Sequence, residues 1–117
     1  MFKVEGTTIT LSRGDTGAFK VTATGYTFGT DDRALFSLKN SQGTVVKQQA
    51  YPMTNNQFIV YFLNADTDTL PPGKYTWDVR YVVNPEYDQQ GNIVDGDQVA
   101  TPKTPQPFEL LAVVGDI

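Results

Sequence analysis

The stretch that decides the fold runs from residue 70 to residue 81 and reads LPPGKYTWDVRY. A Pro-Pro-Gly break opens it, and Gly73 gives the chain the freedom to turn a tight corner. After the corner the sequence alternates strictly, which is typical of a β-strand with one buried face. The apolar face of this strand holds Tyr75, Trp77, Val79, Tyr81 and Val83. The pattern predicts a long strand over 74–83 whose aromatic face points into a core.

Six other short segments have a β pattern, separated by Gly, Asn, Asp and Pro, and no segment shows a sustained helical period. They are 7–11, 18–24, 33–39, 44–51, 57–63 and 107–114. About seven evenly spaced strands predict an all-β antiparallel sandwich, formed by one domain over residues 1–117. Segment 57–63 is apolar on both faces, which predicts either a central strand or a strand with one side covered by a partner.

The stretch from residue 84 to residue 106 interrupts the even spacing of the strands. It is rich in Pro, Gly and acidic residues and nearly free of apolar ones, which predicts a long Pro-rich loop. The sequence DQQGN (88–92) could extend a hairpin in its first half. The second half, TPKTPQP (101–107), is expected to be extended and polyproline-like.

Composition excludes several classes of function. The chain has no His and no Cys, so it lacks the residues for a serine triad, a thiol nucleophile or a His- or Cys-ligated zinc site. Its nine Lys and Arg are scattered, and the net charge is −4, which disfavours binding to nucleic acid or to an anionic membrane. We therefore expect a protein that is not an enzyme, with no cofactor and no catalytic residue.

Two acidic clusters could hold a cation. Asn64, Asp66 and Asp68 alternate, as do Asp95 and Asp97. The first cluster fails the calcium-hand pattern, which requires Gly at its sixth position and Glu at its twelfth. A looser Ca²⁺ site stays open at this point, but turn-capping is the simpler role for Asp66 and Asp68.

Residues 13–15 spell Arg-Gly-Asp, the tripeptide that integrins read on adhesion proteins. The tripeptide lies between two predicted strands that only a few residues separate, so we interpret it as a turn. Gly14 supplies the backbone freedom, and Asp15 is expected to bond the turn amides. Arg13 has no structural role at this stage, so it is a candidate for interaction.

The aromatic residues allow a second function, since sugars stack on exposed rings. Most of the rings fall at alternating strand positions that suit a core. Tyr87 lies in the predicted loop without a structural role, which makes it the second interaction candidate. A small carbohydrate- or cell-surface-binding module is therefore the alternative function.

The corner at 70–81 resembles that of immunoglobulin-like sandwiches. In those domains a Tyr near the start of the sixth strand bonds back to the preceding corner, two residues before an inward core position. Tyr75 matches the first residue and Trp77 the second. The resemblance implies an immunoglobulin-like topology, with 107–114 as the last strand.

The chain as a whole resembles the immunoglobulin-like domain of phage and prophage baseplate or tail proteins. The similarity rests on RGDTGAF (13–19), DDRALFSLKNSQGTVV (31–46), LPPGKYTWDVRY (70–81) and FELL (108–111). The nearest family is the N-terminal domain of upper baseplate proteins from phages of Gram-positive bacteria. This resemblance implies a structural part of a virion that contacts other tail or baseplate subunits, or itself. The opening sequence MFKVEGTTIT has no apolar run like that of a signal peptide, so we expect synthesis in the host cytoplasm.

Overall fold

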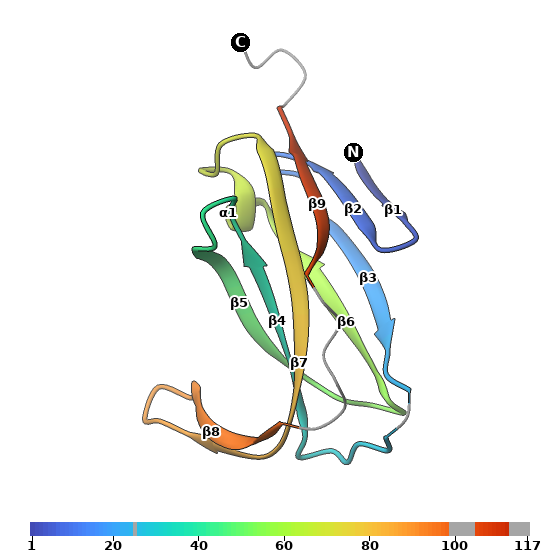
Figure 1. Cartoon of the computed structure of the whole chain (residues 1–117), viewed down its shortest axis with the longest axis vertical. Coiled ribbons are helices and arrows are strands. Elements are labelled where there is room, and N and C mark those ends of the chain that lie inside the picture. Colours follow the sequence, from blue (N-terminus) through green and yellow to red (C-terminus); the bar gives the residue numbers. More distant parts are fainter. Residues whose placement is uncertain (25, 99–104, 113–117) are drawn as a thin grey trace.

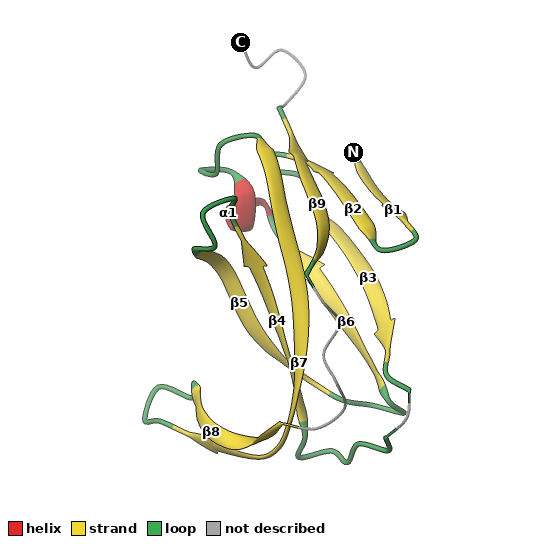
Figure 2. Ribbon diagram, viewed as in Figure 1, coloured by secondary structure: helices red, strands yellow, loops and turns green. Residues whose placement is uncertain are grey.

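The computed structural model describes residues 1–24, 26–98 and 105–112, which form nine strands and one short helix. The strands lie in two packed layers (Figure 1), and loops make most of the connections (Figure 2). The elements are β1 (Phe2–Glu5), β2 (Thr8–Ser12), β3 (Gly17–Thr22), β4 (Arg33–Lys39), β5 (Val45–Pro52), β6 (Gln57–Phe62), α1 (Asn64–Thr67), β7 (Gly73–Tyr87), β8 (Ile93–Gln98) and β9 (Gln106–Leu111).

The larger sheet has the order β1-β2-β9-β7-β4-β5, and β8 pairs with the far end of β7. The smaller sheet contains β3 and β6. Nearly every pair is antiparallel, as expected, but β2 runs parallel to β9. The chain therefore folds as an all-β sandwich in which the two sheets have very different widths.

The core lies between the sheets and is mainly aromatic. Phe36 of β4 packs edge-to-face on Phe62 of β6, with ring centroids 5.9 Å apart, and stacks on Trp77 of β7 at the same distance. Phe19 of β3 joins this cluster through an edge contact with Trp77. Rings of this size bury about 150–250 Å² each and dominate the energetics of a small core.

The corner before β7 has the geometry of immunoglobulin-like sandwiches. The Tyr75 hydroxyl donates to the Pro71 carbonyl at 2.6 Å, and both Tyr75 and Trp77 are buried. The Trp77 indole N–H donates to the Thr7 carbonyl at 2.9 Å, which ties β7 to the turn between β1 and β2. Gly73 has a φ of 151°, a backbone conformation that favours glycine.

The prediction of a long loop over residues 84–106 is wrong for much of that segment. β7 continues to Tyr87, and β8 pairs back onto it, so residues 84–98 form a projecting hairpin that we call the arm. The turn at DQQGN matches the hairpin that the sequence allowed: Asp88 accepts the Gln90 and Asn92 N–H groups at 2.9 Å, and Gly91 has a φ of 84°. Glycine at that position lets the turn close with the twist of its strands.

Other predicted boundaries also change. Gln106 and Pro107 belong to β9, so they are not part of a polyproline segment, and the rest of that predicted segment lies mostly outside the described residues. β1 was missed, and residues 64–67, where Asp66 was expected to cap a turn, form the short helix α1. Segment 57–63 is not a central strand, because β6 pairs only with β3 in the part of the chain that the structure describes.

Candidate interaction surface

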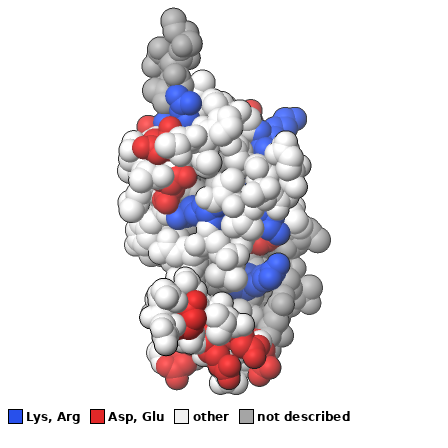
Figure 3. Space-filling model, turned by 90° about the vertical axis from the view of Figure 1, so that its left-hand side faces the viewer, with Lys and Arg blue, Asp and Glu red and all other residues white. Residues whose placement is uncertain are grey.

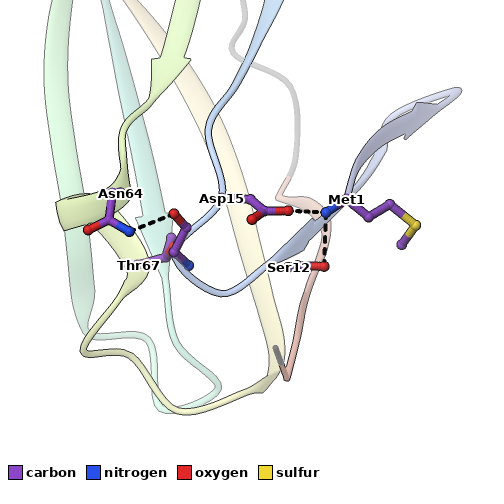
Figure 4. A network of polar contacts seen from close by, with 6 residues as sticks. Met1, Ser12, Asp15, Asn64 and Thr67 are labelled. Carbon is purple, nitrogen blue, oxygen red and sulfur yellow. Dashed lines mark hydrogen bonds and ion pairs between the residues drawn. The ribbon is translucent and has the colours of Figure 1, made fainter. Parts of the chain in front are cut away.

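The Arg-Gly-Asp turn is held by helix α1. The Gly14 N–H donates to the Thr67 hydroxyl at 2.9 Å, and the Asn64 side-chain amide donates to the Gly14 carbonyl at 2.8 Å (Figure 4). Thr67 is fully buried, and Gly14 has a φ of 82°. Both main-chain polar groups of Gly14 therefore have partners, and the turn is fixed to the body of the sandwich.

The neighbours of Gly14 are also tied to the fold. The Asp15 carboxylate contacts the Met1 amino group, which also donates to the Ser12 hydroxyl (Figure 4). This corrects the expected role of Asp15, whose side chain was predicted to bond the turn amides. The Arg13 N–H donates to the Leu111 carbonyl at 2.9 Å, and its side chain is half-buried. The tripeptide is thus a junction of three segments, unlike the tip of a long loop that an adhesion ligand requires.

Helix α1 also covers one end of the inner face of β5. The Lys47 amine of β5 lies 3.3 Å from one oxygen of Asp66 and 5.6 Å from the centre of the Phe62 ring. The other Asp66 oxygen accepts the Leu63 N–H at 2.7 Å and so caps the helix. The Lys47 side chain of this ion pair is only 7% exposed. Exclusion of water around it strengthens the attraction between the two charges. Asp66 therefore fixes α1 over β5.

The outward side of the small sheet is apolar and open to solvent. Ile59, Tyr61 and Leu63 are 43%, 52% and 62% exposed. Tyr61 lies opposite Ala18 of β3, and Ile59 lies opposite Lys20. We call this surface the outer face. It accounts for the two-sided apolar pattern of segment 57–63, since one side of β6 enters the core and the other remains uncovered.

The free edge of β6 can be worked out from its pairing with β3. The Ala23 N–H donates to the Asn56 carbonyl at 2.8 Å, so residues 23 and 56 form a hydrogen-bonded pair. In an antiparallel ladder every second pair of residues is hydrogen-bonded, so the pairs Val21–Phe58, Phe19–Val60 and Gly17–Phe62 are bonded as well. The main-chain groups of Phe58, Val60 and Phe62 therefore point at β3. Those of Ile59 and Tyr61 point away from it, toward the side of β5.

A cleft of about 370 Å³ opens where β5 and β6 separate into different sheets. The two strands leave a tight turn in which Asn55 and Asn56 both have positive φ, at 52° and 59°. The cleft is lined mainly by apolar and uncharged polar side chains, and Lys20 is its one charged lining residue. Its lining residues are Lys20, Tyr51, Pro52, Thr54, Asn55, Gln57, Phe58, Ile59 and Tyr61.

Tyr51 of β5 is one of the two buried side chains that line this cleft, together with Phe58. Its side chain is 7% exposed and stacks on Phe58, but its hydroxyl is buried and has no hydrogen bond to any described residue. Burial raises the pKa of Tyr51, the nearby Tyr61 main chain lowers it, and the charge of Asp66 raises it further. A buried hydroxyl with no partner is costly, which makes this position unusual within the core.

The arm carries a separate concentration of negative charge. Acidic side chains gather at the lower end of the molecule in Figure 3, where the arm projects. The arm contains no Lys or Arg, and Tyr87 on it is 45% exposed. Its acidic residues are Glu86, Asp88, Asp95 and Asp97. Across the described residues, no three acidic side chains converge on one point as a metal site requires.

Comparison with family models and with curated proteins finds no match. Within the part of the chain that the structure describes, no helix is long and apolar enough to cross a membrane.

Sequence reasoning did not find the cleft. Its elements carry a local signal, because the Asn55-Asn56 pair marks a tight turn and segment 57–63 is apolar on both faces. The sequence alone does not show that β5 and β6 enter different sheets after that turn. Arg13 and Tyr87, the predicted interaction candidates, lie on other parts of the molecule and do not line the cleft.

Proposed function

We propose that the chain is a non-enzymatic assembly domain of a phage or prophage tail or baseplate, and that it acts through contacts with neighbouring subunits. The observation that carries this proposal is the outer face, where Ile59, Tyr61 and Leu63 are exposed beside a strand edge with which no other described strand pairs. Apolar patches bounded by polar residues commonly mark protein–protein contacts. The virion setting rests on the resemblance of the turn and corner segments.

The direct test is mass spectrometry of particles purified from a phage or induced prophage that encodes the chain. The proposal predicts that the chain sediments with intact particles. A Tyr61→Glu variant should be depleted from them, because it places a charge in the apolar patch. The matched control is Val45→Glu, which puts the same charge on an exposed apolar position of the other sheet. Absence of the wild-type chain from particles would remove the virion assignment.

A carbohydrate-binding module is the second candidate, and the cleft favours it. Tyr61 offers an exposed ring at the rim, and Asn55 and Gln57 supply amide groups to the lining. Aromatic stacking together with amide hydrogen bonds suits a sugar. This function predicts glycan binding that is lost in Tyr61→Ala and kept in Tyr87→Ala, since Tyr87 lies on the arm.

A further inference from the structure

The strand edges of this fold are not equally protected against pairing with another chain. Natural sheets blunt their exposed edges with short strands, charged side chains, proline or irregular pairing. β1 has four residues and carries Lys3 and Glu5. β8 carries Asp95 and Asp97, and its pairing with β7 is irregular around them. β5 has a register shift and ends at Pro52.

The edge of β6 has none of these protections. Residues 58–62 are Phe, Ile, Val, Tyr and Phe, with no charge, proline or register shift. The Gln57 main chain is already used by the turn, since it exchanges two hydrogen bonds with Thr54. The next main-chain groups on this edge are those of Ile59 and Tyr61, which point away from β3 and make no main-chain hydrogen bond to another described segment. An unprotected apolar edge of this kind is a template for an added strand.

The cleft borders this edge of β6. β6 packs its rings against β4 and β7, through Phe62 on Phe36 and Phe58 on Tyr81. β5 is the next strand beyond β4, so it overhangs the small sheet, and no described strand lies opposite it (Figure 1). A second sandwich that paired through its own β6 would bring its large sheet into the overhanging β5. A single extended segment meets no such obstacle.

The length of the site is set by its two ends. The Thr54–Gln57 bridge closes one end, and α1, which is fixed to β5 by the Asp66–Lys47 pair, closes the other. Residues 58–62 lie between them and span roughly 16 Å at about 3.3 Å per residue. The added segment would therefore contact β6 through about five residues.

We propose that the cleft receives a short extended segment of a partner protein, which adds to β6 as a third strand of the small sheet. This inference rests on the proposed assembly function and names the kind of partner. The segment bonds the Ile59 and Tyr61 main chain, and its inward side chains cover Tyr51 and Phe58. The segment is apolar at alternate positions, free of proline, and neutral or acidic, because Lys20 is the charged residue that lines the cleft.

The test is a selection of random displayed peptides on the folded protein. The inference predicts enriched sequences with alternating β-branched or aromatic residues, whose binding is lost when alternate peptide amides are N-methylated. Ile59→Lys should weaken binding about tenfold, because it gives β6 the charge that protects other edges. Val94→Lys is the matched control, since it charges an exposed apolar position on the arm, and it should leave affinity unchanged.

Four outcomes would overturn the inference. Selected peptides could bind Ile59→Lys as tightly as the wild type, or tolerate N-methylation, and either result would place them elsewhere. The selection could yield no peptide that depends on the cleft, while glycans bind at Tyr61. That result would make the cleft a sugar-binding site. A concentration-dependent dimer that Ile59→Lys abolishes would make the occupant a second copy. Failure of the virion proposal is separate: it would appear as absence of the chain from particles, whatever the peptides do.

Discussion

Replacement of Gly14 by alanine tests how firmly the Arg-Gly-Asp turn is fixed to the sandwich. The residue has a φ of 82°, where a side chain costs about 1–2 kcal/mol. A Cβ at Gly14 would also lie 3.1 Å from the Asn64 amide nitrogen, so Asn64 must shift and weaken its bond to the Gly14 carbonyl. Loss of that bond adds about 1 kcal/mol. The free energy of unfolding should fall by about 2–3 kcal/mol.

Gly43 provides the matched control, because it has the same φ of 82° and open space around its Cα. Gly43→Ala should cost only the backbone term of about 1–2 kcal/mol. Since unfolding of a 117-residue chain has an entropy of about 0.25 kcal/mol/K, the Tm of Gly14→Ala should lie about 4 °C below that of Gly43→Ala. Thermal denaturation followed by circular dichroism measures both. Equal Tm values would refute the claim that α1 stabilises the turn through Asn64.

Three further changes have expected outcomes. Tyr75→Phe removes the 2.6 Å bond to the Pro71 carbonyl and should lower the unfolding free energy, measured by urea denaturation, by about 1 kcal/mol; no loss would mean that the corner does not depend on this bond. Tyr51→Phe removes a buried hydroxyl without a partner and should raise the Tm of the free protein, by up to about 4 °C for ~1 kcal/mol. A lower Tm would show that the hydroxyl has a partner. Burial raises the pKa of Tyr51 and Tyr81 above the ordinary value of 10.0, so the native state holds these protons more tightly than the unfolded state. The free energy of unfolding, measured in urea, should therefore stay constant through pH 9 and fall as the pH rises above about 10. The fall should be less steep in Tyr51→Phe, which has lost one of the two groups.

The sequence predicts the parts of this fold that depend on local chemistry. Alternation in 74–83 identifies the strand with Trp77 on its buried face, and the all-β sandwich is confirmed. The turn at Asp88 is also visible locally, because Gly91 follows an Asx-type cap. In each case the residues that decide the structure lie within one turn or one strand of each other.

The parts that the sequence misses depend on contacts between distant segments. β1 is short and half polar, and its pairing with β2 is set by Phe2, which packs on Phe19. The outer face was visible as a two-sided apolar segment, but a central strand and an uncovered edge strand have the same pattern. Only the divergence of β5 and β6 into separate sheets decides between them, and no local pattern encodes it. The same divergence creates the cleft at Tyr51.

Amide hydrogen exchange at β6 tests the central claim most directly. In the free protein, Phe58 and Val60 should be protected by β3, while Ile59 should exchange quickly because its N–H points away from β3 and no other described strand pairs with that edge. Addition of a selected peptide should slow exchange at Ile59 and leave that at Val60 unchanged. Protection of Ile59 in the free protein, or fast exchange at Ile59 with the peptide bound, would contradict the account of β6 as an open acceptor edge.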